Sequence, residues 1–506
     1  MNHWLVVPII LPAVVAPLIV LAMRHDLVLQ RIFSLAATAM LVAVAIGLTM
    51  VAASGEPQMY ALGNWPAPFG IVLVLDRLSA LMVLLTALLA LPVLIYASHG
   101  WDSRGGHFHA LFQFQLMGLN GAFLTGDLFN LFVFFEVLLI ASYGLMLHGG
   151  GAARVKAGVQ YVVINLTGST LFLVGVGLIY GVTGTLNMAD LAVKVPQVAE
   201  GNRALLHAGA VILLLVFAIK AALVPLHFWL PGTYANAPAP VAALFAIMTK
   251  VGAYSIIRVY TLAFGDGGSG WLAAPWLLPA ALVTLSVGMI GVLAARDLRR
   301  LASFSVIGSM GTLLVGIGLF TPQAMSAALY YLIHSTLIGG ALFLIVDLVA
   351  QRRGAHGASV AVSPAFGQAG ILAALFFLAG IAMAGMPPLS GFIGKLLIMD
   401  SARHAAFAGG IWTVILITSL LCVVGFARAG SNVFWKCAAS NERAAPVPDR
   451  RDALPMAMAF LLLAGTAMLA VFGGPVTGYL DATAGQLFEP TPYIRAVLGS
   501  DALPGR

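Results

Sequence analysis

The chain has 506 residues, of which 61% are hydrophobic and only 8% are charged, and its mean hydropathy is +1.01. Since a soluble domain carries about 25% charged residues, a chain of this length could not cover its own surface in water, so lipid must be its main solvent. The net charge of +7 does not indicate nucleic-acid binding, because the basic residues do not cluster with exposed aromatic residues.

The two cysteines, Cys422 and Cys437, lie in an apolar run and in a polar loop, without a CxxC pattern or a Cys/His cluster. This arrangement argues against iron–sulfur clusters, structural zinc and a disulfide framework. We therefore expect no metal site, no cofactor site and no redox centre in this chain.

Apolar stretches of about 20 residues, long enough to cross a bilayer as a helix, recur with short polar breaks. Because lipid-exposed strands would leave backbone groups unpaired in hydrocarbon, these stretches are predicted to be helices. The fold class is therefore an all-α polytopic membrane protein with about fourteen transmembrane helices. The predicted spans are 4–23, 31–53, 73–97, 107–125, 128–148, 157–181, 204–230, 239–262, 271–295, 303–320, 324–349, 367–400, 407–428 and 454–474.

Every second break between the predicted spans is rich in Lys and Arg. In membrane proteins, the cytoplasmic loops carry the excess of these residues. With the N-terminus outside, six inner breaks hold fifteen basic residues: Arg24, Arg31, Arg104, Arg154, Lys156, Arg296, Arg299, Arg300, Arg352, Arg353, Arg428, Lys436, Arg443, Arg450 and Arg451. The outer segments hold only Arg77, Lys194, Arg203, Arg403, Arg495 and Arg506, with Arg258 close to that side. The sequence thus predicts both ends of the chain on the outer side.

Prolines interrupt two of the spans. Pro225 stands in the seventh, in "FAIKAALVPLHFWLP", and Pro387 and Pro388 stand in the twelfth, in "GMPPLSGFIGK". These spans lie five helices apart and so cross the bilayer in opposite directions. Paired discontinuous helices of this kind frame the midplane sites of inverted-repeat transporters. The alternative is that the prolines only kink their helices.

Five ionisable residues fall deep inside predicted spans: Glu136, Lys220, Lys250, His334 and Lys395. A charge at mid-membrane costs at least about 2.5–3.5 kcal/mol, so several are kept only if they pair or line water. They are therefore candidates for a path of ion or proton transfer. The alternatives are a structural Glu136–Lys220 bridge and, for His334 alone, an ordinary core histidine.

Other ionisable residues carry weaker signals. His227, seven residues after Lys220, is a secondary candidate, because Pro225 makes a shared helix face uncertain. Asp76, Asp347 and Arg258 lie near span ends, where side chains can snorkel to the interface. The histidine-rich loop "SHGWDSRGGHFHA" could bind a metal, but without a carboxylate or cysteine ligand set it is more typical of a hydrated turn.

Three motifs together resemble a known family. "NLFVFFEVLLIASYGLMLHGG", "FAIKAALVPLHFWLPGTYANAPAPVAALFAIMTKVGAYSIIRVY" and "GMPPLSGFIGKLLI" resemble the D-type subunits of the Mrp-type (also Mnh or Pha) multisubunit monovalent cation/proton antiporters. That family is similar to the antiporter-like subunits of respiratory complex I. The resemblance is good over about 60–400, and the length and helix count fit the whole chain.

The resemblance implies an architecture of two inverted five-helix repeats with discontinuous helices 7 and 12. Its parts would be 1–106 (helices 1–3), 107–262 (helices 4–8), 271–430 (helices 9–13) and 431–506 (a cytoplasmic loop, helix 14 and a tail). It also implies roles for the candidates. Glu136 and Lys220 correspond to the pair on helices 5 and 7, Lys250 to the central lysine, His334 to the bridging histidine, and Lys395 to the terminal lysine.

The resemblance further implies a secondary transporter subunit, not an enzyme, that moves H⁺ and Na⁺ or K⁺ without a cofactor. Its partners would be lipid and the antiporter subunits of types A, B, C, E, F and G, not nucleic acid, and its place a bacterial inner membrane. The alternative is a proton-pumping subunit of a complex I-type NADH:quinone oxidoreductase or membrane hydrogenase. A scaffold without ion traffic is a third reading, which the buried ionisable groups oppose.

Two departures from the complex I pattern affect the expected relay. "HSTLIGGALF", after His334, lacks a lysine that complex I relatives commonly have, and "LASFSVIGSMGTLL" lacks a histidine. A relay between Lys250 and Lys395 would therefore depend on His334 and water.

Overall fold

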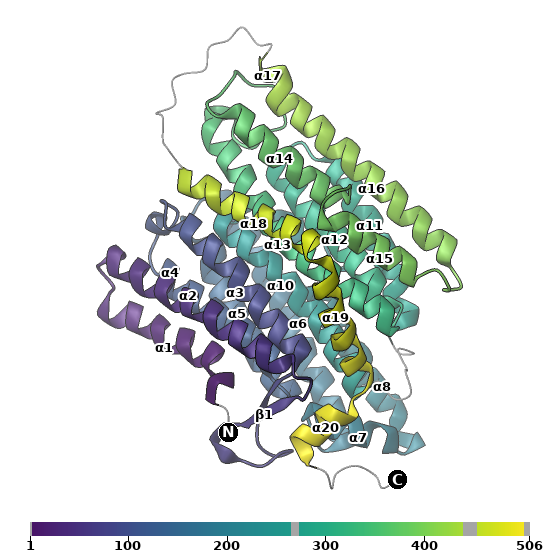
Figure 1. Ribbon diagram of the computed structural model, residues 1–506. Helices are drawn as coiled ribbons and strands as arrows, with labels where there is room; N and C mark the ends of the chain where they lie inside the picture. The colour runs from purple at the N-terminus through teal and green to yellow at the C-terminus, as the bar shows by residue number, and fades with distance from the viewer. Residues whose placement is uncertain (1–2, 265–272, 439–452, 500–506) are drawn as a thin grey trace.

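The computed structural model describes residues 3–264, 273–438 and 453–499, and this part of the chain is almost entirely helical (Figure 1). The helices of its first half are α1 (Val7–Ala22), α2 (Leu27–Ala52), α3 (Arg77–Ala97), α4 (Phe108–Leu124), α5 (Leu128–Leu147), α6 (Ala152–Thr183), α7 (Met188–Lys194), α8 (Glu200–Lys220), α9 (Trp229–Asn236) and α10 (Ala239–Arg258). Those of the second half are α11 (Ala274–Ala294), α12 (Leu298–Gly318), α13 (Pro322–Arg352), α14 (Ala369–Ala384), α15 (Ser390–Ser401), α16 (Ala408–Gly430), α17 (Lys436–Ala438), α18 (Ala453–Val471), α19 (Gly473–Phe488) and α20 (Thr491–Leu498).

The predicted spans agree with these helices. Within the described residues, eleven helices are long and apolar enough to cross a membrane. The other three predicted spans, 4–23, 107–125 and 367–400, correspond to α1, α4 and the α14–α15 pair. The two proline-containing spans are both discontinuous, as α8–α9 and α14–α15. The prediction of about fourteen transmembrane helices, with helices 7 and 12 broken, is confirmed.

The prediction of helix alone is wrong in one place. Residues 58–61 (β1) and 72–75 (β2) form a two-stranded antiparallel hairpin, in which Gln58 pairs with Leu75. The apolar start of the span predicted at 73–97 is therefore strand β2, and α3 begins only after the cap residue Asp76. All four residues of β2 are buried inside the protein, and the rule against strands applies only to backbone that is exposed to lipid.

One backbone pattern occurs twice. Asp127 caps α5 and forms an isolated bridge with Asn187, which follows α6; Asp297 caps α12 and bridges Ser359, which follows α13. Matching hydrogen bonds flank both bridges. In addition, π-helical turns close both α10 (at 259–263) and α16 (at 431–435). These features show that the two halves of the molecule are repeats that run in opposite directions. The residue bounds predicted for the two repeats stay a prediction.

The two ends of the bundle differ. Arg104, Arg154, Arg299 and Arg352 lie in or next to the breaks at one end, which we call the arginine-rich end. Both termini, the hairpin, α7 and α20 lie at the opposite end, which we call the terminal end (Figure 1). An even number of crossings accounts for this arrangement.

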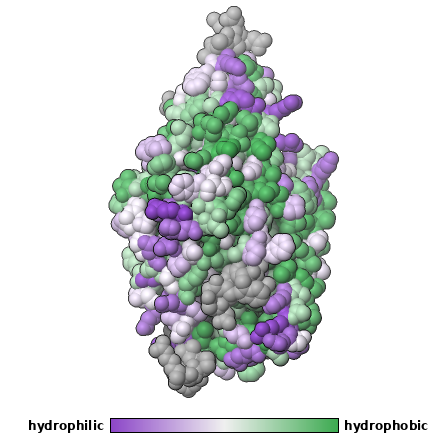
Figure 2. Space-filling view, turned by 90° about the vertical axis from the view of Figure 1, so that its right-hand side faces the viewer, coloured by the Kyte–Doolittle hydropathy of each residue, from purple (hydrophilic) through white to green (hydrophobic). Residues whose placement is uncertain are grey.

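Helices α10, α12 and α13 form the centre of the molecule. The most apolar stretch of α10 is fully buried, whereas two thirds of the corresponding stretches of α16 and α18 are not. Broad apolar areas, interrupted by smaller hydrophilic patches, cover the surface in Figure 2, as lipid contact requires. Helix 14 (α18) and the following helix α19 both pack against α13 and run diagonally in Figure 1, and α20 packs against α7.

Candidate functional site

Both broken helices place a lysine at the end of their first half. Lys220 is the last residue of α8. Lys395 belongs to α15, but its Nζ reaches back 2.8 Å to the carbonyl oxygen of Ala384, the last residue of α14. The last carbonyl groups of a helix lack partners and carry the negative end of the helix dipole, so a cation is favoured there. The two halves thus build the same feature from different sequence positions.

Lys220 is held by helix α6. Only 7% of this residue is exposed, and its Nζ donates a 2.8 Å hydrogen bond to Oδ1 of Asn165. The Nζ also lies 5.8 Å from the centre of the Phe135 ring, so Lys220 faces the stretch of α5 that carries Glu136. Glu136 acts on Lys220 electrostatically.

Glu136 is half-buried and accepts a short hydrogen bond from the hydroxyl of Ser169. Within the described residues no ion pair joins Glu136 to Lys220. Instead, Asn165 and Ser169 lie one turn apart on α6, and residues spaced by four share one face of a helix. The acid and the base therefore sit beside the same α6 face, each held by its own polar partner.

Lys250, in the middle of α10, is completely buried. Its Nζ has no hydrogen-bond partner among the described residues. An ammonium there would hold three donors without a protein acceptor, so Lys250 is not part of a structural ion pair. Gly252 brings α10 close to Lys220: a Cβ on this glycine would lie 2.6 Å from the nitrogen of Ala221.

His334, on α13, connects the centre to the second broken helix. It is fully buried; its Nδ1 lies 2.9 Å from the hydroxyl of Ser390, the first residue of α15, and its Nε2 has no partner among the described residues. Lys250 and Lys395 both lie within electrostatic range of its ring. Lys395, 4% exposed, also donates 2.9 Å to the Ser419 hydroxyl.

His227 stands apart from these residues. It lies half-buried in the break between α8 and α9, and its Nδ1 has no partner among the described residues. The described contacts join it to none of the other five candidates, so its role stays a prediction.

The charged residues near the helix ends do not snorkel, contrary to expectation. Arg258 is 3% exposed and Asp76 2%, and they form a two-pronged ion pair at 2.5 and 2.8 Å. Asp347, 3% exposed, lies at the arginine-rich end of α13. Such buried charges need the partners that the fold supplies.

One histidine of the predicted hydrated turn is buried. His109 Nε2 lies 3.1 Å from Oδ2 of Asp102. Arg31 donates one hydrogen bond to each carboxylate oxygen of Asp102. Burial alone would raise the pKa of Asp102, but the hydrogen bonds from His109 and Arg31 outweigh it and lower that pKa to about 2. No cluster of three metal-ligating side chains occurs in the described ranges.

Sequence reasoning missed the neutral partners: Asn165, Ser169, Ser390 and Ser419. The signal for Asn165 was present, since an amide inside an apolar span has to find a hydrogen bond. Serines give no such signal, because a serine in a helix can bond to its own backbone.

Comparison with known proteins shows the family of the chain. Residues 125–425, which contain all six candidates, match the family model described as "NADH:quinone oxidoreductase/Mrp antiporter, TM". A probable K⁺/H⁺ antiporter D-type subunit of Rhizobium meliloti (strain 1021) is 42% identical, with 99% of this chain and 98% of that protein covered. A Na⁺/H⁺ antiporter D-type subunit of Bacillus subtilis (strain 168) is 40% identical, with 98% and 100% covered. The chain belongs to the family of Mrp antiporter D-type subunits.

Structural comparison supports the same family. A chain in the structure of the Mrp complex from Dietzia sp. DQ12-45-1b matches with a TM-score of 0.85 and 28% identity, over 99% of this chain and all of that one. As a member of this family, the chain is a multi-pass membrane component of a transporter, not an enzyme, and its partners are other antiporter subunits.

Proposed function

We propose that this D-type antiporter subunit carries protons along a mid-membrane row, Glu136, Lys220, Lys250, His334 and Lys395, in exchange for Na⁺ or K⁺. The observation that carries the proposal is the pair of buried lysines at the ends of the two broken half-helices, with Lys250 and His334 between them. Structural ion pairs do not explain these residues, since none of the five forms an ion pair within the described parts of the chain.

The first step concerns α6. In the arrangement seen here, Asn165 holds Lys220 and Ser169 holds Glu136. If Lys220 moves from Asn165 towards Glu136, the carboxylate favours its charged form; the return movement releases a proton towards Lys250. A cation, or movement in a neighbouring subunit, could drive this exchange of partners. The groups titrate as a coupled set, so no single step belongs to one residue.

The orientation belongs to the proposal as well. The arginine-rich end is assigned to the inside of a bacterial cell membrane and both termini to the outside, because Lys and Arg accumulate in inner loops. The transported ions are H⁺ and Na⁺ or K⁺, and no cofactor takes part. Because its five residues lie at mid-membrane, the row would run roughly in the membrane plane. Separate paths for protons would connect it to each side of the membrane.

The test is cation-driven proton release in vesicles from antiporter-deficient cells that produce the complete complex. Glu136→Ala and Lys220→Ala should reduce exchange to background, with complex assembly unchanged, and Lys395→Ala should reduce it strongly. Lys156→Ala, which removes an exposed lysine at the start of α6, is the matched control. Wild-type exchange in the first two variants would exclude the proposed row. Exchange that required NADH or quinone would favour the complex I-type alternative.

A further inference from the structure

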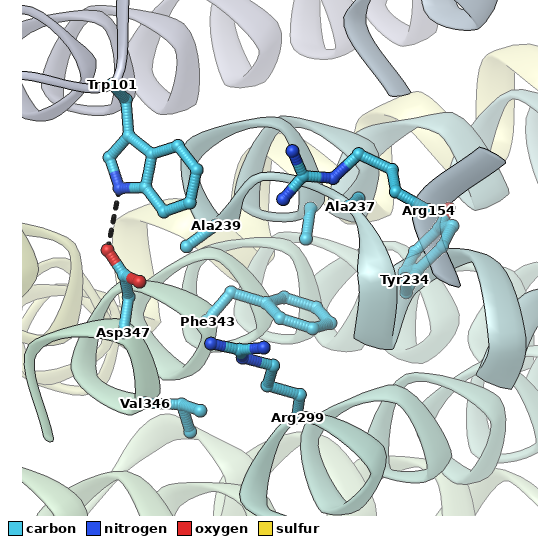
Figure 3. Close-up of a pocket in the computed structure, with 10 residues that line it drawn as sticks. Trp101, Arg154, Tyr234, Ala237, Ala239, Arg299, Phe343, Val346 and Asp347 are labelled. Atoms are coloured by element: carbon cyan, nitrogen blue, oxygen red, sulfur yellow. Dashed lines mark hydrogen bonds between the residues drawn. The ribbon is translucent and has the colours of Figure 1, made fainter. Parts of the chain in front are cut away.

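A second group of polar residues lies at the arginine-rich end, outside the row. A cavity of about 30 Å³ opens there, and since one water needs roughly 10–15 Å³, it has room for about two. Figure 3 shows its walls, which come from the N-terminal helices and from both repeats: Trp101, Arg154, Tyr234, Arg299, Phe343 and Asp347.

Within the described ranges, the hydrogen bonds that the Asp347 side chain accepts all go to one of its two carboxylate oxygens. Its Oδ2 accepts hydrogen bonds from the Tyr96 hydroxyl (2.7 Å), the Trp101 indole (2.8 Å) and the Gln351 amide (2.7 Å). In Figure 3 the other oxygen is turned towards the cavity. Among the described residues Asp347 forms no ion pair. The fold therefore fixes this carboxylate through one oxygen and leaves the second for a small occupant.

Two arginines line the cavity together with this carboxylate. Arg299, exposed at the start of α12, acts electrostatically on Asp347 and on Arg154 without pairing with either in the described structure. Arg154, at the start of α6, is held by the carbonyl oxygens of Asn236 (2.8 Å) and Gly150 (3.1 Å). The mouth of the cavity is thus positively charged, and a buried carboxylate lies behind it.

Helix α10 leads from this cavity to the row. Ala239 and Ala242 line the cavity, and Lys250 lies eight residues after Ala242 on the same helix, about 12 Å away at roughly 1.5 Å per residue. Between them, α10 meets α13 through small residues: a Cβ on Gly339 would lie 3.3 Å from that of Ala246.

Phe343 is the one large apolar side chain that α13 adds to this cavity lining within the described structure. It is 3% exposed, and its ring centre lies 6.0 Å from that of Tyr234. On α13, Phe343 lies between Asp347, which lines the cavity, and Gly339, which packs against Ala246 of α10. The Phe343 ring therefore stands between the cavity and this contact of small residues. It can therefore separate the cavity from Lys250.

We propose that this cavity is the port through which protons from the arginine-rich side reach Lys250. Asp347 accepts the proton from water in the cavity: an O–H bond of that water breaks as one forms at the cavity-facing oxygen of Asp347. The O–H bond at Asp347 then breaks, the proton passes along water molecules that enter when Phe343 moves, and an N–H bond forms at the neutral amine of Lys250. Phe343 closes the port between transfers. The charged groups that face Asp347 are Arg299 and Arg154; its other neighbours are the neutral donors Tyr96, Trp101 and Gln351. The inference rests on the proposed function.

Labelling of introduced cysteines tests the route. In the complete complex, with Cys422→Ser and Cys437→Ser, we expect Ala242→Cys to react with Ag⁺, a thiol reagent small enough for a cavity that holds about two waters, applied from the arginine-rich side. The reaction is measured as the loss of thiol that can still be labelled after denaturation. Ala246→Cys lies on the Lys250 side of the Phe343 ring and should react at least tenfold more slowly than Ala242→Cys. Combining Ala246→Cys with Phe343→Ala should remove most of that difference in rate. Labelling of Ala242→Cys only from the terminal side, or from neither side of an assembled complex, would overturn the port.

Exchange measurements test the acceptor. Asp347→Asn keeps an oxygen for the three donors but not the carboxylate, so the complex should assemble and exchange should fall at least tenfold. Asp347→Glu should restore part of the activity. The matched control is Asp26→Asn, an exposed acid at the N-cap of α2, where asparagine caps equally well.

The outcomes separate the two proposals. If Asp347→Asn exchanges at the wild-type rate while Glu136→Ala and Lys220→Ala are inactive, the port is wrong and the row stands. If Glu136→Ala and Lys220→Ala also exchange normally, the proposed function itself fails. Loss of activity in Asp347→Asn without recovery in Asp347→Glu, combined with an unlabelled Ala242→Cys, would mean that Asp347 only holds Trp101 and Tyr96 in place.

Discussion

Neutral residues on α6 hold the charged ones. Asn165 accepts a hydrogen bond from Lys220, and Ser169 donates one to Glu136, so each charged group has its own neutral partner. A hydrogen bond to a charged group is worth roughly 1.5–3 kcal/mol, which is comparable to the cost of a charge at mid-membrane. A hydrogen bond of this strength can hold a lysine and still break. This is what a lysine that changes partners during transport requires.

Asn165→Leu tests this directly. Without its acceptor, Lys220 loses roughly 1.5–3 kcal/mol of stabilisation, and we expect exchange in vesicles to fall about tenfold or more. Thr167→Val, two residues away on an exposed side of α6, is the control, because in the described structure its hydroxyl donates to the backbone oxygen of Val163. Equal exchange in the two variants would show that Asn165 has no part in the row.

Asp102 gives a prediction for stability rather than transport. Its lowered pKa, about 2 against an ordinary 3.8, means that its contribution is complete above about pH 5 and is lost as the pH falls towards 2. At pH 7, Asp102→Asn should lower the free energy of unfolding by about 1–2 kcal/mol, discounted because Arg31 is one-third exposed. Thermal unfolding in detergent should show the gap between variant and wild type closing below pH 4; a gap independent of pH contradicts the ion pair.

At the scale of elements, the broken helices explain why lysines lie where they do. A half-helix that ends inside the membrane exposes carbonyl groups that no water can satisfy, and a lysine ammonium is a suitable partner. α14 ends in this way against Lys395, and α8 ends with Lys220 itself. Close packing then sets the distance to the central helix, since α10 approaches the end of α8 at Gly252.

Gly252→Ala should push these elements apart. The added methyl group would lie 2.6 Å from the nitrogen of Ala221 and 2.7 Å from the oxygen of Phe217, so the backbone must shift. Overpacking of this kind costs about 1–3 kcal/mol, and we expect a lower melting temperature together with reduced exchange. Gly177→Ala, in open space on α6, should keep both properties or gain slightly in stability. If both variants behave alike, close approach at Gly252 is unimportant.

At the scale of the whole molecule, the sequence predicted the elements better than their contacts. Apolar length identifies the spans. Proline and buried charge point to the two breaks and to the residues of the proposed row, because each violates the rules of a lipid-embedded helix. The hairpin at 58–75 and helices α19 and α20 lie outside the bilayer pattern and therefore went unpredicted. Lys395 reaches the end of α14 because of the direction in which its side chain points. A hydropathy pattern carries no information on side-chain direction, so the sequence could not predict this contact.

The central claim is that Lys250 passes protons between the two halves. The most direct measurement is proton release on addition of Na⁺ or K⁺ to vesicles that contain the complete complex with Lys250→Ala. We predict no release above background for either cation, with the subunits present at wild-type amounts. Release at the wild-type rate from an equally assembled complex would contradict the account.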